Sequence, residues 1–419
     1  MLRNRALLTL WAGEFASRIG ESIFQIALLW YLLERTGSSL ATGLVTMVSY
    51  LPAFLVGAWA GVLVDRLDYR RVMAGANAAR IVLAAGLPLL VLAVELPVAG
   101  IAAVGFLLTS ATAFFNPARD ASIPVLARRE ELVSANSLVQ SAWQFSLVIG
   151  PFLAAALLPV LRTEFLFFAV ALAFALSLAV LLRLGLRGAL AAAAPAGAGA
   201  GIGAAVAAVP TPGPGTSAPG SFGAEFRAGW GYLRGERRVW WLWIITLTNN
   251  FFLMGPVFVG IPFYVQRYLG GTGTDFALVE GTYAGGMIVS TWLISRYGTR
   301  FNPVYVLFTA LIWDGLTYLP LLWVTSVEGT LLTILVHSVG IPAITISRIT
   351  ALHRIVPQHL QGRVFSYIHL AVAGMTALSI GVVGVVLTWL PANWLFAVIG
   401  VLCAATGVWG WLLPVFREA

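Results

Sequence analysis

The feature that most constrains this chain is a long apolar run near its N-terminus, residues 7–33, which is interrupted along one side only. Four polar residues, Glu14, Arg18, Glu21 and Gln25, follow one another at spacings of four, three and four. On a helix of 3.6 residues per turn they form one narrow stripe. Such a run can cross a bilayer, and an ionised group at its centre costs about 2.5–3.5 kcal/mol on insertion scales. We therefore expect the stripe to face other helices or a water-filled cavity.

The composition of the whole chain agrees with a membrane environment. The sequence is 59% hydrophobic and only 10% charged, which is far from the composition of a soluble domain of 419 residues. The single cysteine, Cys403, excludes an intramolecular disulfide and a cysteine-rich metal site. The basic N-terminus resembles a signal peptide, but its apolar run is too long and lacks a small-residue cleavage site. We therefore interpret it as a retained first span.

Twelve apolar spans are predicted, in two sets of six. The first set covers residues 7–33, 40–63, 72–94, 98–118, 136–160 and 164–183. The second set covers residues 240–266, 276–296, 303–325, 329–349, 363–388 and 392–413. The sequence thus predicts an all-α membrane protein with twelve transmembrane helices.

An Ala/Gly/Pro-rich stretch separates the two sets of spans. Its glycines and prolines disfavour a stable helix, so it is expected to be a flexible cytoplasmic linker followed by an amphipathic segment. The predicted domains are an N-terminal six-helix bundle over 1–187, the linker and amphipathic segment over 188–238, and a C-terminal six-helix bundle over 239–419.

The arginines set the predicted orientation. All 25 basic residues are Arg, and with both termini in the cytoplasm twenty of them fall on the cytoplasmic side. Three (Arg35, Arg162 and Arg267) fall outside, and Arg18 and Arg80 lie within spans. This bias follows the positive-inside rule. The net charge of +8 therefore requires no nucleic-acid partner.

The two halves resemble each other after their fourth spans. Residues 116–137 and residues 346–366 each contain an Arg at the membrane exit, an apolar turn with Pro, a polar stretch and the start of the next span. Such an internal duplication predicts a binding site near the bilayer midplane, between the halves.

The loop after the second span carries a specific motif. Gly61, Leu63, Asp65, Arg66 and the pair of arginines at 70 and 71 match the pattern G-x-L-x-D-R-x-x-x-R-R. This stretch resembles the signature of the major facilitator superfamily between its second and third helices. The resemblance covers both six-helix halves and implies two pseudo-symmetric bundles, the major facilitator fold.

Further motifs resemble one branch of that superfamily. Gly150 and Pro151 resemble the antiporter motif of the drug/proton branch, although alanines 154–156 stand where further glycines are usual. The stretches 116–120, 135–137 and 362–364 are most similar to the group of macrolide-efflux proteins and the enterobactin exporter.

The resemblance also implies a conformational latch on the cytoplasmic side. Asp65 is placed to meet a cytoplasmic Arg and the positive N-terminus of a neighbouring helix. That neighbour is implied to be the eleventh span, with Arg119 as the charge partner of Asp65. The expected latch residues are Gly61, Asp65, Arg66, Arg70, Arg71, Arg119 and Arg363. An alternative is that the loop arginines only set the topology.

Proton coupling is expected at the stripe, because the resemblance places the first, fourth, seventh and tenth helices around the central cavity. Glu21 lies near the middle of its span, one turn from Arg18, where a change of surroundings can make it take up or release a proton. We expect Glu21 to be the main proton and cation site, Glu14 a second acid, and Arg18 the charge that tunes both. The alternative is a fixed ionic network that only holds helices together.

Other polar, aromatic and Met side chains are candidates for the substrate cavity, because they offer adaptable contacts to bulky ligands. They are Gln25, Gln140, Gln144, Asn249, Asn250, Phe252, Met254, Phe258 and His337. Gly255 and Pro256 predict a kink in the seventh span. Whether Asp314 and Glu280 serve function or structure is left open.

The sequence contains no nucleophile–base set, metal-ligand spacing or phosphate-binding glycine loop, so we expect no enzyme and no cofactor. The leading hypothesis is a secondary transporter that exports amphipathic drug-like or natural-product molecules by proton antiport, with alternating access around a midplane cavity. The alternatives are a lipid or lysophospholipid flippase, a non-transporting membrane receptor and a nutrient importer. The expected partners are a small-molecule substrate, protons and membrane lipid. The protein is expected to be a monomer in a prokaryotic cytoplasmic (inner) membrane.

Overall fold

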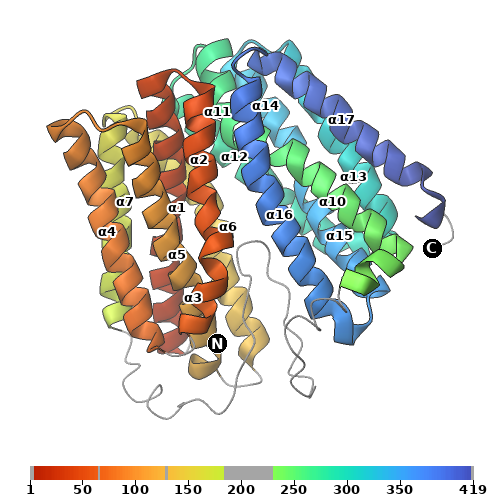
Figure 1. The fold of residues 1–419 in the computed structure, drawn as a ribbon, viewed down its shortest axis with the longest axis horizontal. Coiled ribbons are helices and arrows are strands. Elements are labelled where there is room, and N and C mark those ends of the chain that lie inside the picture. The colour runs from red at the N-terminus through yellow and green to blue at the C-terminus, as the bar shows by residue number, and fades with distance from the viewer. Residues whose placement is uncertain (1–3, 65–66, 128–130, 184–229, 417–419) are drawn as a thin grey trace. The chain divides into compact units, whose positions relative to one another are not determined.

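The computed structural model describes residues 4–64, 67–127, 131–183 and 230–416. The described residues form helices and short connections, without a β-strand (Figure 1). Contacts divide the chain into two compact units. Unit 1 comprises residues 1–209 and 273–281, and unit 2 comprises residues 210–272 and 282–419. The predicted linker lies outside the described residues from position 188 to position 229, so the predicted domain boundaries stay a prediction.

Unit 1 contains the first six predicted spans, each of which coincides with a helix or with two consecutive helices. The helices are α1 (Arg5–Thr36), α2 (Ser39–Leu55), α3 (Gly57–Val64), α4 (Tyr69–Ala93), α5 (Val98–Leu126), α6 (Leu132–Leu157) and α7 (Leu166–Leu182), with the 3₁₀ turn η2 (Thr163–Phe165) before α7.

Unit 2 contains the last six predicted spans, again in helical form. The seventh span is α10 (Arg237–Gly255), η3 (Pro256–Gly260), α11 (Ile261–Phe263) and η4 (Tyr264–Tyr268). The eighth is α12 (Gly273–Tyr297), whose first residues belong to unit 1, followed by the 3₁₀ turn η5 (Gly298–Arg300). The others are α13 (Pro303–Tyr318) with η6 (Leu319–Leu322), α14 (Val327–Ser338) with α15 (Gly340–Ile355), α16 (Gln358–Val386), and α17 (Ala392–Leu412) with η7 (Pro414–Phe416).

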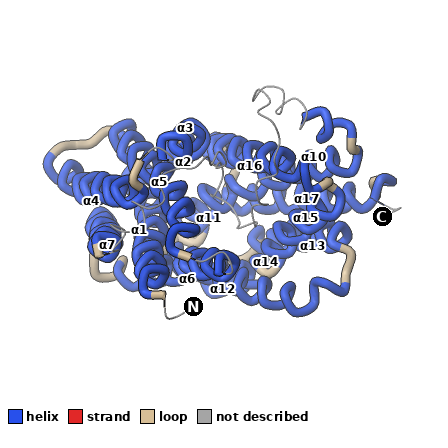
Figure 2. The backbone as a smooth tube through the Cα atoms, turned by 90° about the horizontal axis from the view of Figure 1, so that it is seen from below, coloured by secondary structure: helices blue, strands red, loops and turns tan. Residues whose placement is uncertain are grey.

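The two units repeat the same pairwise packing. In unit 1, α1 packs on α6, and α4 packs on α5 and α7. In unit 2, the corresponding helices do the same, because α10 packs on α16, and α13 packs on α15 and α17. Figure 2 shows the helices of each unit from below. This correspondence agrees with two pseudo-symmetric six-helix bundles.

Local sequence signals explain where the helices begin and end. The side chain of Asn4 accepts hydrogen bonds from the first backbone N–H groups of α1, and Asp68 does the same for α4. At the other end of α1, Gly37 adopts a left-handed conformation with φ of 58°, which a residue without a Cβ adopts without strain. The cap at Asp68 belongs to the loop motif recognised in the sequence.

The seventh span departs from a regular α-helix at the predicted position. α10 ends at Gly255, and a π-helical turn starts at Pro256. Proline cannot donate a backbone hydrogen bond, so the helical ladder is interrupted there. The hydroxyl of Ser379 in α16 instead accepts a hydrogen bond from the N–H of Gly255 at 2.7 Å. The irregularity predicted from the Gly–Pro pair is thus present.

Nine helical segments of the described chain are long and apolar enough to cross a membrane. α1 is not among these nine, although it has 32 residues, since Glu14, Arg18 and Glu21 interrupt its apolar sequence. Backbone polar groups must be satisfied internally in lipid, and helices achieve this. The chain is therefore an integral membrane protein.

Candidate functional site

The polar stripe of α1 forms a chain of ion pairs. Arg18 Nε lies 2.7 Å from Glu14 Oε1, and Arg18 Nη1 lies 2.8 Å from Glu21 Oε2. The spacings of four and three residues place the three side chains on one face of the helix, as the sequence predicts. Gln25 does not join this chain, because its Nε2 donates to the Tyr50 hydroxyl of α2 at 3.0 Å.

Two other helices of unit 1 add partners to the stripe. From α4, Arg80 Nη1 lies 3.4 Å from Glu21 Oε1. From α5, the Arg119 guanidinium forms an ion pair with Glu14, and Arg18 Nη2 donates to Asn116 Oδ1 at 2.9 Å. The three charged members of the stripe therefore face other helices, as expected from the cost of placing charges in lipid.

The network is balanced in charge. Its carboxylates are Glu14, Glu21 and Asp120, and its guanidinium groups are Arg18, Arg80 and Arg119; Arg119 Nη2 lies 2.7 Å from Asp120 Oδ1. Buried charges are tolerated where opposite charges and hydrogen bonds compensate them. In addition, Arg80 Nη1 donates to Ser17 Oγ at 2.8 Å, and its guanidinium lies 4.5 Å from the centre of the Phe115 ring. We name these six charged residues the α1 network.

The two network glutamates of α1 differ in accessibility. The Glu14 side chain is 1% exposed and accepts from both Arg18 and Arg119. The Glu21 side chain is 19% exposed, and its contact with Arg80 is the longer of its two ion pairs. Of the two network glutamates on α1, Glu21 is therefore the one that water and ligands can reach, whereas Glu14 is enclosed.

Arg80 and Asp120 belong to the α1 network but are not among the site residues predicted from the sequence. The sequence places Arg80 within a predicted span, and in the structure its side chain is fully buried. An ionisable residue within a transmembrane segment is by default a functional candidate, so the position of Arg80 within a span could have identified it. Arg119 was counted with the cytoplasmic charges and as the partner of Asp65, yet it is buried within α5 and bonded to Glu14 and Asp120.

The latch is only partly within the described chain. Asp65 and Arg66 lie outside the described residues, as do the surroundings of Gly61 and the side chain of Arg363. Arg71 is exposed, and Arg70 Nη2 donates to the backbone carbonyl of Leu182 at the end of α7. The latch stays a prediction.

The antiporter-like motif lies where α6 contacts α1. A Cβ built on Gly150 would lie 2.5 Å from the Cβ of Ser22, so only glycine fits at this contact. Small residues allow transmembrane helices to approach closely. The motif therefore brings α6 against the helix that carries the α1 network.

Gly150→Ala is expected to destabilise unit 1 by about 1–3 kcal/mol, the usual cost of overpacking. Gly86→Ala in α4 is the matched control, because a Cβ there meets nothing within 4 Å and alanine favours a helix. Thermal unfolding of both variants in detergent measures the difference. Equal melting temperatures for Gly150→Ala and the native protein would contradict the close contact.

The substrate-cavity candidates of α10 differ in their surroundings. Asn250 Nδ2 donates to Val372 O at 2.9 Å and to Thr376 Oγ1 at 2.8 Å, so it ties α10 to α16. Asn249 is buried and its Nδ2 has no partner within the described chain. The remaining candidates Gln140, Gln144, Phe252, Met254 and Phe258 are half-buried. Their role in binding stays a prediction.

His337 lies inside unit 2 beside Asp314. His337 Nε2 is 3.5 Å from Asp314 Oδ1, and both side chains are buried. The Thr317 hydroxyl contacts the other ring nitrogen at 3.0 Å, and the Tyr318 ring packs 4.0 Å from the imidazole. This places Asp314 in a helix-packing contact between α13 and α14.

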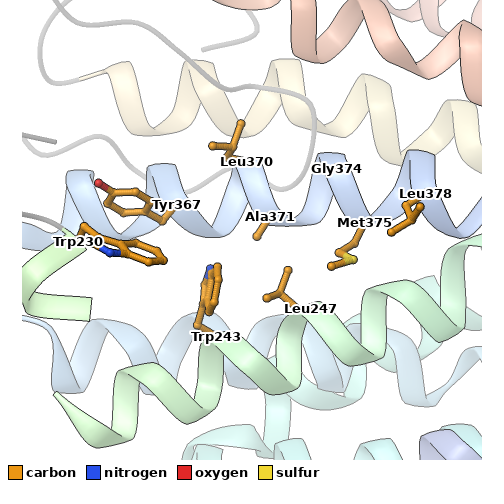
Figure 3. Close-up of a pocket in the computed structure, with 9 residues that line it drawn as sticks. All are labelled: Trp230, Trp243, Leu247, Tyr367, Leu370, Ala371, Gly374, Met375 and Leu378. Carbon is orange, nitrogen blue, oxygen red and sulfur yellow. The ribbon is translucent and has the colours of Figure 1, made fainter. Parts of the chain in front are cut away.

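Unit 2 also contains an apolar pocket of about 520 Å³ between α10 and α16 (Figure 3). Trp230, which precedes α10, and Trp243 face Tyr367 and Met375 of α16 across it. Gly374 lies at its wall. None of these pocket residues is among the substrate-cavity candidates predicted from the sequence.

Two helical bundles with a charge network inside one of them define a polytopic membrane transporter. The sequence matches the family model of the Major Facilitator Superfamily over residues 10–313, and the chain belongs to that family. It is 27% identical to macrolide efflux protein A of Streptococcus pyogenes over 311 residues, covering 74% of this chain and 71% of that protein. It is 30% identical to the multidrug efflux pump Tap of Mycolicibacterium fortuitum over 155 residues, covering 36% and 37%.

Solved structures share the fold at low sequence identity. A bacterial homologue of the iron transporter ferroportin, in an inward-facing state, aligns with a TM-score of 0.73 at 16% identity, covering 99% of this chain and 98% of that chain. A POT family transporter in complex with 5-aminolevulinic acid aligns with a TM-score of 0.71 at 14% identity, covering 96% and 95%. These similarities confirm the predicted major facilitator fold, and membership of this transporter family confirms that the chain is not an enzyme.

Proposed function

We propose that this chain is a secondary active transporter that exports amphipathic drug-like or natural-product molecules by proton antiport. The observation that carries the proposal is the α1 network, in which the Glu21 carboxylate is 19% exposed while Glu14 and Arg80 are enclosed. Intramembrane ionisable groups are costly, and they are retained where protons or ligands bind. The network therefore supports a coupling role in preference to a purely structural one.

The coupling step is a proton exchange at Glu21. When the Glu21 carboxylate takes up a proton, Arg18 and Arg80 lose an anionic partner, and the charge balance of the network changes by one unit. A conformational change that moves Arg18 or Arg80 back towards Glu21 favours release of that proton. Glu14 keeps Arg18 and Arg119 in place during this exchange, because it is enclosed between them.

The names of the relatives support export of drug-like molecules. One is named a macrolide efflux protein and another a multidrug efflux pump. In the same proposal, the two six-helix bundles alternate access to a midplane cavity. The protein works as a monomer in the prokaryotic cytoplasmic membrane, with both termini in the cytoplasm.

The apolar pocket of Figure 3 offers a surface for the apolar part of such molecules. Gly374→Leu is expected to fill it, since a Cβ at Gly374 meets nothing within 4 Å. Binding of an apolar fluorescent dye, followed by its anisotropy, should weaken roughly tenfold, which corresponds to about 1.4 kcal/mol. The control Gly86→Leu in α4 places the same side chain on an open surface of unit 1. Unchanged dye binding by Gly374→Leu would exclude the pocket as the dye site.

The function is tested with everted vesicles that carry an imposed pH gradient. Addition of a macrolide or a cationic dye should dissipate the gradient in vesicles with the native protein and leave it intact in vesicles without it. If no ligand moves protons, proton antiport is wrong. If a lysolipid is translocated without proton movement, the protein is a flippase instead.

A further inference from the structure

Unit 2 contains a buried arginine, Arg348, that has no ion pair within the described chain. Arg348 lies on α15, seven residues before the helix ends at Ile355, and it is only 9% exposed. Within the described chain it forms no ion pair, and its Nε has no hydrogen-bond acceptor. The positive-inside rule assigns this residue to the cytoplasmic side, but the structure buries it.

The absence of an acid around Arg348 follows from the sequence of unit 2. No Asp or Glu occurs between Glu328 and Glu418, and none occurs in α10. The described acids of unit 2 lie elsewhere. Glu236 caps α10, Asp314 lies beside His337, and Glu328 is in the first turn of α14. The helices α10, α15 and α16 therefore supply no carboxylate to Arg348.

Arg119 of unit 1 provides an internal comparison. Arg119 lies near the end of the fourth predicted span, and Arg348 lies near the end of the tenth. These are corresponding positions in the duplicated halves. Arg119 is compensated by Glu14 and Asp120. A buried charge without compensation is strongly destabilising. Unit 2 retains this cost, which an anionic group of a bound ligand would remove.

A second basic side chain is close to Arg348. His369 of α16 is near enough to interact with it electrostatically, and it is half-buried. Arg348 and His369 thus bring two hydrogen-bond donors, one from each of two helices, near each other. A guanidinium binds a carboxylate or a phosphate through two parallel hydrogen bonds, and these charge-assisted bonds are strong.

We propose that Arg348, assisted by His369, recognises an anionic group, a carboxylate or a phosphate, on the molecule that the protein binds. This inference rests on the proposed transport function and adds amphiphiles with an anionic group to its substrate class. The carboxylate of a transported molecule and the phosphate of a lipid headgroup share this chemistry. The apolar pocket is a separate feature, because Arg348 is not among its lining residues.

The test compares pyrenebutyrate with its neutral amide as ligands of the purified full-length protein in a neutral detergent. The native protein should bind the acid about 10- to 100-fold more tightly than the amide, the usual gain from a charge-assisted pair. Arg348→Gln should lose this preference and keep its affinity for the amide, whereas Arg348→Lys should retain part of it. The control Arg354→Gln, an exposed arginine of the same helix, should behave as the native protein.

Thermal unfolding provides a readout that does not depend on transport. Pyrenebutyrate should raise the melting temperature of the native protein and not that of Arg348→Gln. Competition by phosphatidylglycerol, but not by phosphatidylcholine, would identify a lipid headgroup as the source of the anion. Equal affinity of the native protein for acid and amide, or an unchanged preference in Arg348→Gln, would overturn the proposal. Because no proton flux is measured, failure of antiport would leave a positive binding result intact.

Discussion

Glu21→Gln is expected to abolish ligand-driven proton movement while the protein still folds and binds its ligand. Glutamine keeps the size of the side chain and an acceptor oxygen for Arg18, but it cannot exchange a proton. Arg18 also stays paired with Glu14 at 2.7 Å, so the helix contacts are retained. In everted vesicles the ligand-driven dissipation of a pH gradient should fall at least about tenfold, an effect of about 1.4 kcal/mol or more.

Glu34→Gln is the matched control for this experiment, because it changes a glutamate on the same helix outside the α1 network. Glu34 accepts from Trp30 Nε1 at 2.6 Å and from Thr163 Oγ1 at 2.7 Å. Its replacement should leave proton movement unchanged. If Glu21→Gln moves protons as well as the native protein, the network is a structural ionic contact and the proton site lies elsewhere.

The second large effect is expected for Glu14→Gln. Glu14 is enclosed between Arg18 and Arg119, so its neutralisation leaves two guanidinium groups with one anion fewer in a buried place. Removing one partner of a buried ion pair typically costs about 3–5 kcal/mol. A large fall in melting temperature and in the yield of monodisperse protein should follow, measured by thermal unfolding and size-exclusion chromatography.

The double variant Glu14→Gln/Arg119→Gln distinguishes the loss of a charge from the loss of a side chain. It removes one charge of each sign, so the network is again balanced, and much of the lost stability should return. Strong non-additivity of the single and double variants is the signature of a coupled pair. Additive losses would show that Glu14 and Arg119 act independently.

The polar stripe shows which contacts helical periodicity predicts and which it does not. The spacings of Glu14, Arg18 and Glu21 predict that these side chains meet, and they do so at 2.7 and 2.8 Å. The same periodicity places Gln25 on the stripe, yet it bonds to Tyr50 of α2. Spacing along one helix fixes a direction, whereas the partner found in that direction depends on the neighbouring helix.

Arg80, Arg119 and Arg348 show where a count of charges fails. All three are basic residues of a membrane protein, and a rule based on loops assigned Arg119 and Arg348 to the cytoplasmic surface. The structure buries all three, and within the described residues only the two in unit 1 have a carboxylate at ion-pair distance. The length of an apolar run does not show how far its helix continues into polar sequence. Both α5 and α15 extend beyond their predicted spans.

The sequence by itself determined that the chain crosses a membrane as helices, where those helices lie, and that charges of α1 must face protein. These conclusions follow from bilayer thickness, from the need to satisfy backbone hydrogen bonds in lipid, and from the 3.6-residue period. Only the tertiary structure decided that Arg80 and Arg119 complete the α1 network, and that Arg348 is buried. Such partners come from helices far apart in sequence, and their meeting depends on how each helix is rotated and packed within its bundle.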